Sequence, residues 1–257
     1  MAARPKLCLT LLIALAIALG GSLIGNYFLF NKAIDFYTRE AAIRIDPIDL
    51  KRYAQENAEV SSREKQKPRI IVFGESRANM WRTAIPENWG DVEIINRGIG
   101  GETTPQIKAR LRSDVLALDP DLVIMQMGDN DLKAMAMMPE RKSEIEQQTY
   151  QNILQIARAI RNSGAEALIT TIFPPAPIEL LRTPLWSDEV NPAIDALNER
   201  LLALDEPAIT VVDCDVFLRQ GDYIKPEFAI DTLHMKPVGY QALNEGLEET
   251  VKGLLAK

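Results

Sequence analysis

Five short apolar runs alternate with helical patterns between Arg69 and the C-terminus, and this alternation limits the fold more than any other feature. Apolar runs bounded by turn residues are typical of strands that are buried on both faces of a parallel sheet. We therefore expect an α/β domain whose five-stranded parallel sheet is covered by helices on both sides. The expected strands are 70–73, 92–95, 122–127, 167–173 and 209–212, and the clearest helical patterns lie at 153–160, 190–201 and 237–254.

The N-terminus carries a long apolar run. Residues 7–30 contain no charged side chain, and such a run is long enough to cross a bilayer as a helix. Arg4 and Lys6 precede it, which predicts a cytoplasmic N-terminus and a domain on the other side of the membrane. We interpret residues 1–30 as an uncleaved signal anchor. A signal peptide cleaved near the small residues 18–22 is the close alternative. A buried soluble helix is less favoured because the run has no polar face.

Residues 31–67 form a charged segment that we interpret as a spacer, partly helical, before a domain at 68–257. Asp46-Pro47 is a good helix start, so a helix from Pro47 to about Val60 is expected. The polar stretch 61–68 is typical of a solvated linker.

Composition excludes several classes of function. The net charge of -7 argues against a nucleic-acid partner, because phosphate binding needs a basic face. Cys8 lies in the apolar run and Cys214 in the domain, so no internal disulfide is expected. His234 is the single histidine and hence the only candidate for imidazole chemistry.

Five short motifs lie at four of the predicted strand ends and in the last loop. The carboxyl ends of parallel strands form one edge of a sheet, where open α/β sheets bind their ligands. Each motif alone has an ordinary structural interpretation, such as a glycine turn, a polar strand end or a surface His–Asp pair. The motifs are Gly74-Glu75-Ser76, Asn96 to Thr104, Gly128-Asp129-Asn130-Asp131, Phe173-Pro174-Pro175 and Asp231-Thr232-Leu233-His234.

Taken together and in this order, the motifs resemble the blocks of the SGNH (GDSL-like) hydrolases. That family has Gly-Asp-Ser in its first block, a turn from Asn to Gly in its second, Gly-x-Asn-Asp in its third and Asp-x-x-His in its fifth. The turn at 96–104 is similar to that of the platelet-activating-factor acetylhydrolase branch and its bacterial relatives. The resemblance covers about Arg69 to the C-terminus and implies a three-layer, flavodoxin-like fold. One departure is Glu75, which stands where the family has Asp.

The resemblance implies a catalytic triad. Ser76 would be the nucleophile, His234 the base that takes its proton, and Asp231 the acid that orients the imidazole. No metal and no organic cofactor is expected. A metal site at Asp213 and Asp215 carries little weight, because acidic strand ends are usually solvated or cap a helix.

The resemblance also assigns an oxyanion hole. Its donors would be the backbone N–H groups of Ser76 and Gly101 and the side-chain amide of Asn130. Gly98 or Gly100 would take the place of Gly101 if the turn is shifted.

Two tryptophans are the expected substrate-binding side chains. Trp81 lies five residues after the serine, like the family's extension of the first block. Trp186 lies in the proline-rich segment 174–190, which would be either a loop packed on the domain or a wall for an apolar acyl chain.

The implied function is a membrane-anchored serine esterase that faces the periplasm or the cell exterior. Small acyl esters are the expected substrates, either carbohydrate O-acetyl groups or lipid esters. One alternative is an envelope polysaccharide O-acetyltransferase that uses the same triad. Another is a catalytically weak binding or assembly protein of the envelope, which only Glu75 supports.

Overall fold

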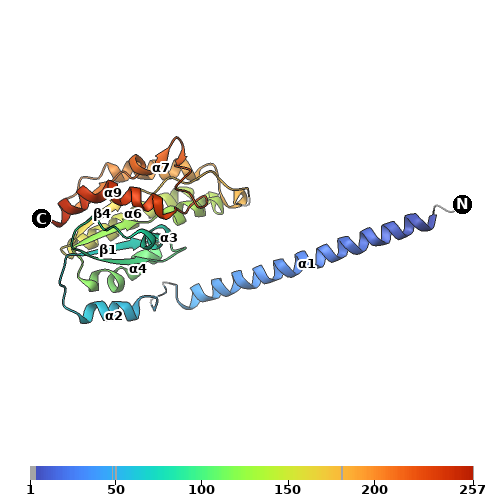
Figure 1. Ribbon diagram of the computed structural model, residues 1–257, viewed down its shortest axis with the longest axis horizontal. Coiled ribbons are helices and arrows are strands. Elements are labelled where there is room, and N and C mark those ends of the chain that lie inside the picture. Colours follow the sequence, from blue (N-terminus) through green and yellow to red (C-terminus); the bar gives the residue numbers. More distant parts are fainter. Residues whose placement is uncertain (1–3, 48, 50, 181, 257) are drawn as a thin grey trace. The chain divides into compact units, whose positions relative to one another are not determined.

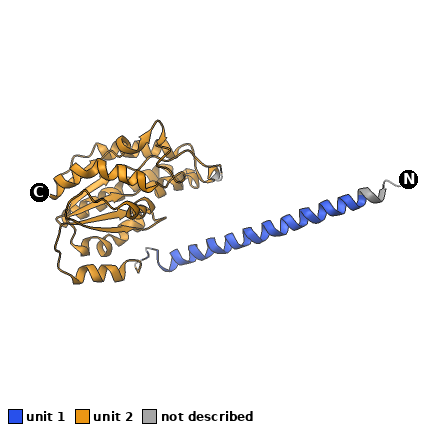
Figure 2. Ribbon diagram, in the orientation of Figure 1, with its two compact units in different colours: residues 1–49 blue, residues 50–257 orange. Residues whose placement is uncertain are grey.

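The computed structural model describes residues 4–47, 49, 51–180 and 182–256. The chain separates into two compact units, residues 1–49 and residues 50–257 (Figure 2). We describe each unit by itself.

The first unit is one long helix, α1 (Arg4–Ile45). Its part from Cys8 to Ile45 is long and apolar enough to cross a membrane, and the large apolar side chains along it are exposed. The helix continues beyond Phe30, where the apolar run ends. The first part of the expected spacer is therefore helical without a break from the apolar run.

The second unit is built on a five-stranded parallel sheet in the order β2-β1-β3-β4-β5 (Figure 1). The predicted parallel α/β fold is confirmed, and every predicted strand is present. The strands are β1 (Arg69–Gly74), β2 (Glu93–Gly98), β3 (Leu122–Gln126), β4 (Glu166–Thr170) and β5 (Ile209–Val212).

Helices and short turns connect the strands. The helices are α2 (Ala54–Ser62), α3 (Ser76–Met80), α4 (Thr104–Asp114), α5 (Asp129–Lys133), α6 (Lys142–Asn162), α7 (Val190–Leu202), α8 (Asp215–Leu218) and α9 (Pro237–Leu255). Single 3-10 turns are η1 (Trp81–Ala84), η2 (Leu116–Leu118), η3 (Ala134–Ala136), η4 (Pro139–Arg141) and η5 (Thr183–Leu185), and β6 (Arg219–Gln220) pairs with β7 (Tyr223–Ile224) as a small hairpin.

The sheet separates two layers of apolar core, and β1 contributes side chains to both. Ile71 and Phe73 point to one side of the sheet, where they join apolar side chains of α4, α6 and α7. Ile70 and Val72 point to the other side and join those of α3, α8 and α9. Because side chains alternate along a strand, one apolar run fills both layers.

Helix α2 differs from the expected spacer helix in position and in role. Asp49 has a φ of 43°, which an α-helix does not allow, so the helix begins at Ala54 and not at Pro47. Tyr53 and Val60 are buried, and the Tyr53 hydroxyl donates to the carbonyl of Gly98 at 2.6 Å. The segment from residue 50 therefore belongs to the domain, which begins before residue 68.

This packing predicts that two truncations differ in stability. A fragment that starts at residue 50 keeps Tyr53 and Val60, whereas one that starts at residue 68 loses both. Burying one such side chain contributes about 1.5–3 kcal/mol to stability. The free energy of unfolding of the shorter fragment, measured by urea unfolding, should therefore be lower by about 3–6 kcal/mol. The Tyr53→Ala, Val60→Ala variant of the longer fragment is the matched control and should show a similar loss. Equal stability of the two fragments would contradict the assignment of α2 to the domain.

Candidate active site

The carboxyl edge of the sheet brings the expected motifs together. In register, Gly74 at the end of β1 lies beside Gly98 of β2 and Gln126 of β3. A Cβ on Gly74 would lie 1.7 Å from the carbonyl oxygen of Gln126, and the residue has a φ of 155°. Only glycine fits there, so the chain can leave β1 directly into the nucleophile turn.

Ser76, His234 and Asp231 form one hydrogen-bonded chain. The Ser76 hydroxyl oxygen lies 3.2 Å from Nε2 of His234, and Nδ1 of His234 lies 2.9 Å from Oδ2 of Asp231. All three side chains are partly exposed, so a substrate can reach them. These are the distances that proton transfer from the serine to the imidazole requires.

Asp231 is held as a carboxylate. Burial opposes ionisation, but the hydrogen bond from His234 and the backbone N–H groups of Leu233 and His234 lower the pKa of Asp231 to about 2. Its Oδ1 accepts both N–H groups, at 2.7 and 2.9 Å, which leaves Oδ2 for the imidazole. The tight Asp-x-x-His spacing therefore fixes the acid and the base relative to each other.

The glycine turn after β2 lies next to the serine. A Cβ on Gly100 would lie 3.7 Å from Cβ of Ser76, and Gly101 has the left-handed φ of 84°. Asn130 anchors the far end of this turn, because its side-chain amide donates to the carbonyl of Glu102 at 3.0 Å. The structure thus brings Ser76, Gly100, Gly101 and Asn130 to one place.

Arg110 of α4 holds the same turn from behind. It is fully buried and donates to the carbonyl of Gly74 at 2.9 Å and to the Glu102 carboxylate at 2.7 Å. One guanidinium thus joins the end of β1 to the end of the glycine turn. Such a connection holds the glycine turn in place relative to the end of β1 without a substrate.

Glu75 is a buried acid below the nucleophile. Its two oxygens accept the backbone N–H groups of Asp129 and Asn130, at 3.1 and 3.3 Å. Burial, and then the nearby Asp129 carboxylate, raise the pKa of Glu75 well above its usual range. Burial alone would raise the pKa of Asp129, but Arg77 and the hydrogen bond with Glu75 lower it below its usual range. The opposite directions of the two pKa shifts favour a proton on Glu75 and a carboxylate at Asp129.

Arg77 joins the nucleophile to the histidine loop. Its guanidinium lies 3.1 Å from Oδ2 of Asp129 and donates to the carbonyls of Leu233 and Phe173, at 2.7 and 2.6 Å. It directly follows Ser76, and Leu233 directly precedes His234. Sequence reasoning missed this residue, because no local pattern distinguishes a buried arginine from an exposed one.

The two tryptophans do not fit the substrate-binding role expected of them. Trp81 is 2% exposed and packs on Phe173 and Tyr240, and its indole N–H donates to Asn244 of α9. Trp186 is 9% exposed and belongs to the core on the α6 and α7 side. The sequence around each tryptophan does not show which side of the chain other elements cover, so their burial could not be predicted from it.

The acidic strand end after β5 has protein partners of its own. Asp215 pairs with Arg219 at 2.7 Å, and Asp213 accepts the N–H of Asp215 at 3.0 Å. Both carboxylates thus serve the local turn before α8.

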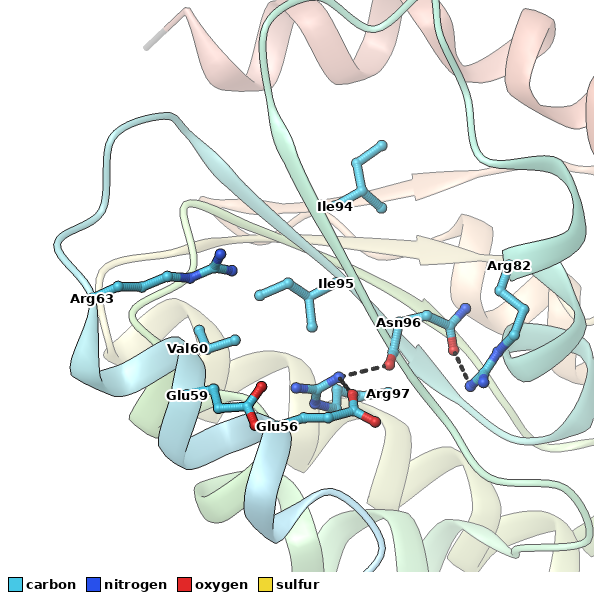
Figure 3. A pocket seen from close by; sticks show the side chains of 9 residues that line it. All are labelled: Glu56, Glu59, Val60, Arg63, Arg82, Ile94, Ile95, Asn96 and Arg97. Atoms are coloured by element: carbon cyan, nitrogen blue, oxygen red, sulfur yellow. Dashed lines mark hydrogen bonds and ion pairs between the residues drawn. The ribbon is translucent and has the colours of Figure 1, made fainter.

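One pocket lies near the carboxyl edge of the sheet, and another lies beside the edge strand β2. The first, of about 350 Å³, is lined by Lys133, Glu179, Arg182 and Leu185. Arg182 reaches to 3.6 Å from Oδ2 of Asp231, so this pocket borders the triad. The other, of about 390 Å³, lies between α2 and the edge strand β2, where Arg97 points toward Glu56 (Figure 3). None of the three triad side chains lines it.

Comparison with known proteins identifies the family. Residues 64–242 match the model of the GDSL-like lipase/acylhydrolase family. The chain belongs to this family. Membership makes the protein a carboxylic ester hydrolase, and the sequence-based assignment to the SGNH (GDSL-like) hydrolases is confirmed.

Solved structures share the fold of this GDSL-like chain. A Bacteroides fragilis protein assigned as an acylhydrolase is 27% identical, with a TM-score of 0.69 over 82% of this chain and 99% of that one. A Streptococcus pneumonia protein assigned as a platelet activating factor is 20% identical, with a TM-score of 0.68 over 85% and 99%.

One curated relative is an uncharacterized lipoprotein of Bacillus subtilis. It is 30% identical over 120 residues, which are 41% of this chain and 48% of that protein. The chain therefore matches about half of the length of this relative.

A proton on Glu75 predicts that two variants of this residue differ in the size of their effect. Glu75→Gln keeps an uncharged acceptor and donor in place, so hydrolysis of an aryl ester should stay within about tenfold of wild type. Glu75→Ala leaves two buried N–H groups without an acceptor and should lower the free energy of unfolding by about 2–4 kcal/mol and activity more than tenfold. If Glu75→Gln were as damaging as Glu75→Ala, Glu75 would act as a carboxylate.

The same proton predicts a pH dependence of stability. Because folding raises the pKa of Glu75, its contribution is complete below the ordinary pKa of a glutamate, about 4.3, and is lost as the pH rises toward the raised value. The wild type should therefore lose stability relative to Glu75→Gln as the pH rises from the ordinary pKa of a glutamate to the raised pKa of Glu75. Urea unfolding of both proteins at each pH measures this difference.

Proposed function

We propose that this protein is a serine esterase that acts through Ser76, His234 and Asp231. The hydrogen-bonded chain from the Ser76 hydroxyl through the imidazole to the Asp231 carboxylate carries the proposal. The family supplies the reaction class, which is hydrolysis of a carboxylic ester.

The reaction proceeds in two halves. The Ser76 oxygen attacks the ester carbonyl while His234 takes the serine proton at Nε2, and Asp231 stabilises the imidazolium that forms. His234 then gives this proton to the departing alcohol oxygen, which leaves an acyl-enzyme. A water molecule, deprotonated by His234, releases the acid and restores the serine.

The oxyanion hole of this mechanism uses Ser76, Gly101 and Asn130. The N–H groups of Ser76 and Gly101 and the Asn130 amide donate to the oxygen that becomes negative. Asn130 supports this role because its amide already points toward the glycine turn. One such donor contributes about 10²–10³ to the rate of comparable reactions.

The substrate is a small acyl ester, and the charged pocket supports a carbohydrate ester over a long-chain lipid. Of the described side chains that line it, Lys133, Glu179 and Arg182 are charged and Leu185 is apolar. A long apolar acyl chain would gain little by contacting such a wall. A neighbour of the same fold is described as an acetyl xylan esterase, which is consistent with a carbohydrate ester.

We also propose that α1 anchors the protein in a membrane and that the domain faces the periplasm or the cell exterior. Among the described residues of the first unit, the large apolar side chains of α1 are exposed. Arg4 and Lys6 before it set the orientation by the positive-inside rule. A lipoprotein among the relatives is consistent with a location at the cell envelope.

A fluorophosphonate probe tests the mechanism. Wild type should be labelled, and Ser76→Ala should lose all labelling, because the probe reacts only with an activated serine. His234→Ala should lower aryl ester hydrolysis by about 10⁴-fold or more. Ser163→Ala is the matched serine control, since that hydroxyl caps the end of α6. A folded wild type that resists the probe and hydrolyses no aryl ester would disprove the proposal.

Cell fractionation tests the location. The intact chain should stay in the membrane fraction after alkaline extraction, and protease added to spheroplasts should digest the domain. A mature N-terminus after about residue 18 would show a cleaved signal peptide and contradict the anchor. Protection from the protease in intact spheroplasts, with digestion after lysis, would contradict the orientation.

A further inference from the structure

Two basic side chains border the triad from different elements. Lys133 lies at the end of α5, and Arg182 lies in the loop that follows β4. Together with Glu179 and Leu185 they line the pocket of about 350 Å³. The proposed mechanism gives neither of these two cations a task.

The pocket extends from the oxyanion side of the site to the acid of the triad. The Lys133 ammonium donates to the side-chain oxygen of Asn130 at 2.9 Å. The Arg182 guanidinium lies 3.6 Å from Oδ2 of Asp231. The two cations therefore contact residues on both sides of Ser76, the proposed oxyanion donor Asn130 and the proposed triad acid Asp231.

The described side chains that line the pocket carry two positive charges, on Lys133 and Arg182, and one negative charge, on Glu179, although the chain as a whole has a net charge of -7. The partner of Lys133 is a neutral amide oxygen. Arg182 faces Glu179 and Asp231, but each of these ion pairs is 3.6 Å long and the Arg182 side chain is about a quarter exposed. Ion pairs of this length in contact with water contribute little, so both cations can turn to a ligand.

We propose that the enzyme selects esters that carry an anionic group, a carboxylate or a phosphate, a few bonds from the scissile carbonyl. Lys133 and Arg182 are the specificity residues, and an acidic sugar with an O-acyl group has the required chemistry. This inference rests on the proposed serine esterase function and adds the substrate class to it. Arginine and lysine recognise these oxyanions by charge-assisted hydrogen bonds.

Three acetylated sugars test the selectivity. They share one ring and one acetylated hydroxyl and differ only at C6: glucose, glucuronate and glucose 6-phosphate. With the full chain in neutral detergent, kcat/KM for at least one anionic sugar should exceed that for glucose by about tenfold. The two anionic sugars distinguish a carboxylate from a phosphate as the preferred group. Added salt should reduce the preference, since it screens charges in contact with solvent.

Variants assign the preference to the pocket. Lys133→Gln and Arg182→Gln should each lower the ratio of anionic to neutral kcat/KM, and the double variant should bring it near one. The ratio is the readout because both residues also contact the proposed catalytic groups. Lys252→Gln, at the last turn of α9, removes the same charge outside the pocket and should keep the ratio.

The outcomes separate the inference from the function on which it rests. Hydrolysis of 4-nitrophenyl acetate that depends on Ser76, without preference among the three sugars, would overturn the inference and leave the esterase function intact. A preference that survives in the double variant would also overturn it. A wild type that hydrolyses neither the aryl ester nor any sugar would overturn the function and the inference together.

Discussion

Glu75 and Asp129 form a buried pair of acids beside Arg77, and the opposite shifts of their pKa values favour one proton between them. Two ionised carboxylates in this dry position would repel each other, and two protonated acids would leave Arg77 without a counter-charge. With one proton, Glu75 accepts two N–H groups and Asp129 pairs with Arg77. The turn that carries the serine, the start of α5 with Asn130, and the loop that carries His234 are thereby tied to one cluster.

This cluster explains why a glutamate stands where the family has an aspartate. Its longer side chain reaches both N–H groups at the start of α5, next to Asn130, while it remains close to the Asp129 carboxylate. The acid is thus a structural part of the nucleophile turn and does not touch the reacting atoms. The envelope-binding alternative rested on this substitution alone, and the environment of Glu75 removes that support.

Local sequence patterns predicted the features that depend on neighbouring residues alone, which are the strands and the contact between Asp231 and His234. The apolar runs predicted all five strands, because strands of a parallel sheet that helices cover are rich in apolar residues. The Asp231–His234 spacing predicted a pair that the loop itself closes. Trp81 and Trp186, by contrast, are covered by α9 and by the α6 and α7 side, and α2 packs on the domain through Tyr53. Which distant element covers a side chain is decided by the tertiary fold, so no local pattern indicates it. The burial of Arg77 has the same origin.

The same distinction applies to the two cations near the triad. Lys133 follows Asn130 by one helical turn, so a reader of the sequence could have placed it near the oxyanion side. Arg182 comes from a loop whose path follows from tertiary packing alone. Both side chains are positive, whereas the net charge of the protein is negative. Their field orients a ligand only at short range, because water and salt screen it beyond the pocket. Lys133 and Arg182 therefore discriminate among esters that have already reached the site, while the net negative charge of the chain gives no long-range attraction to an anionic substrate.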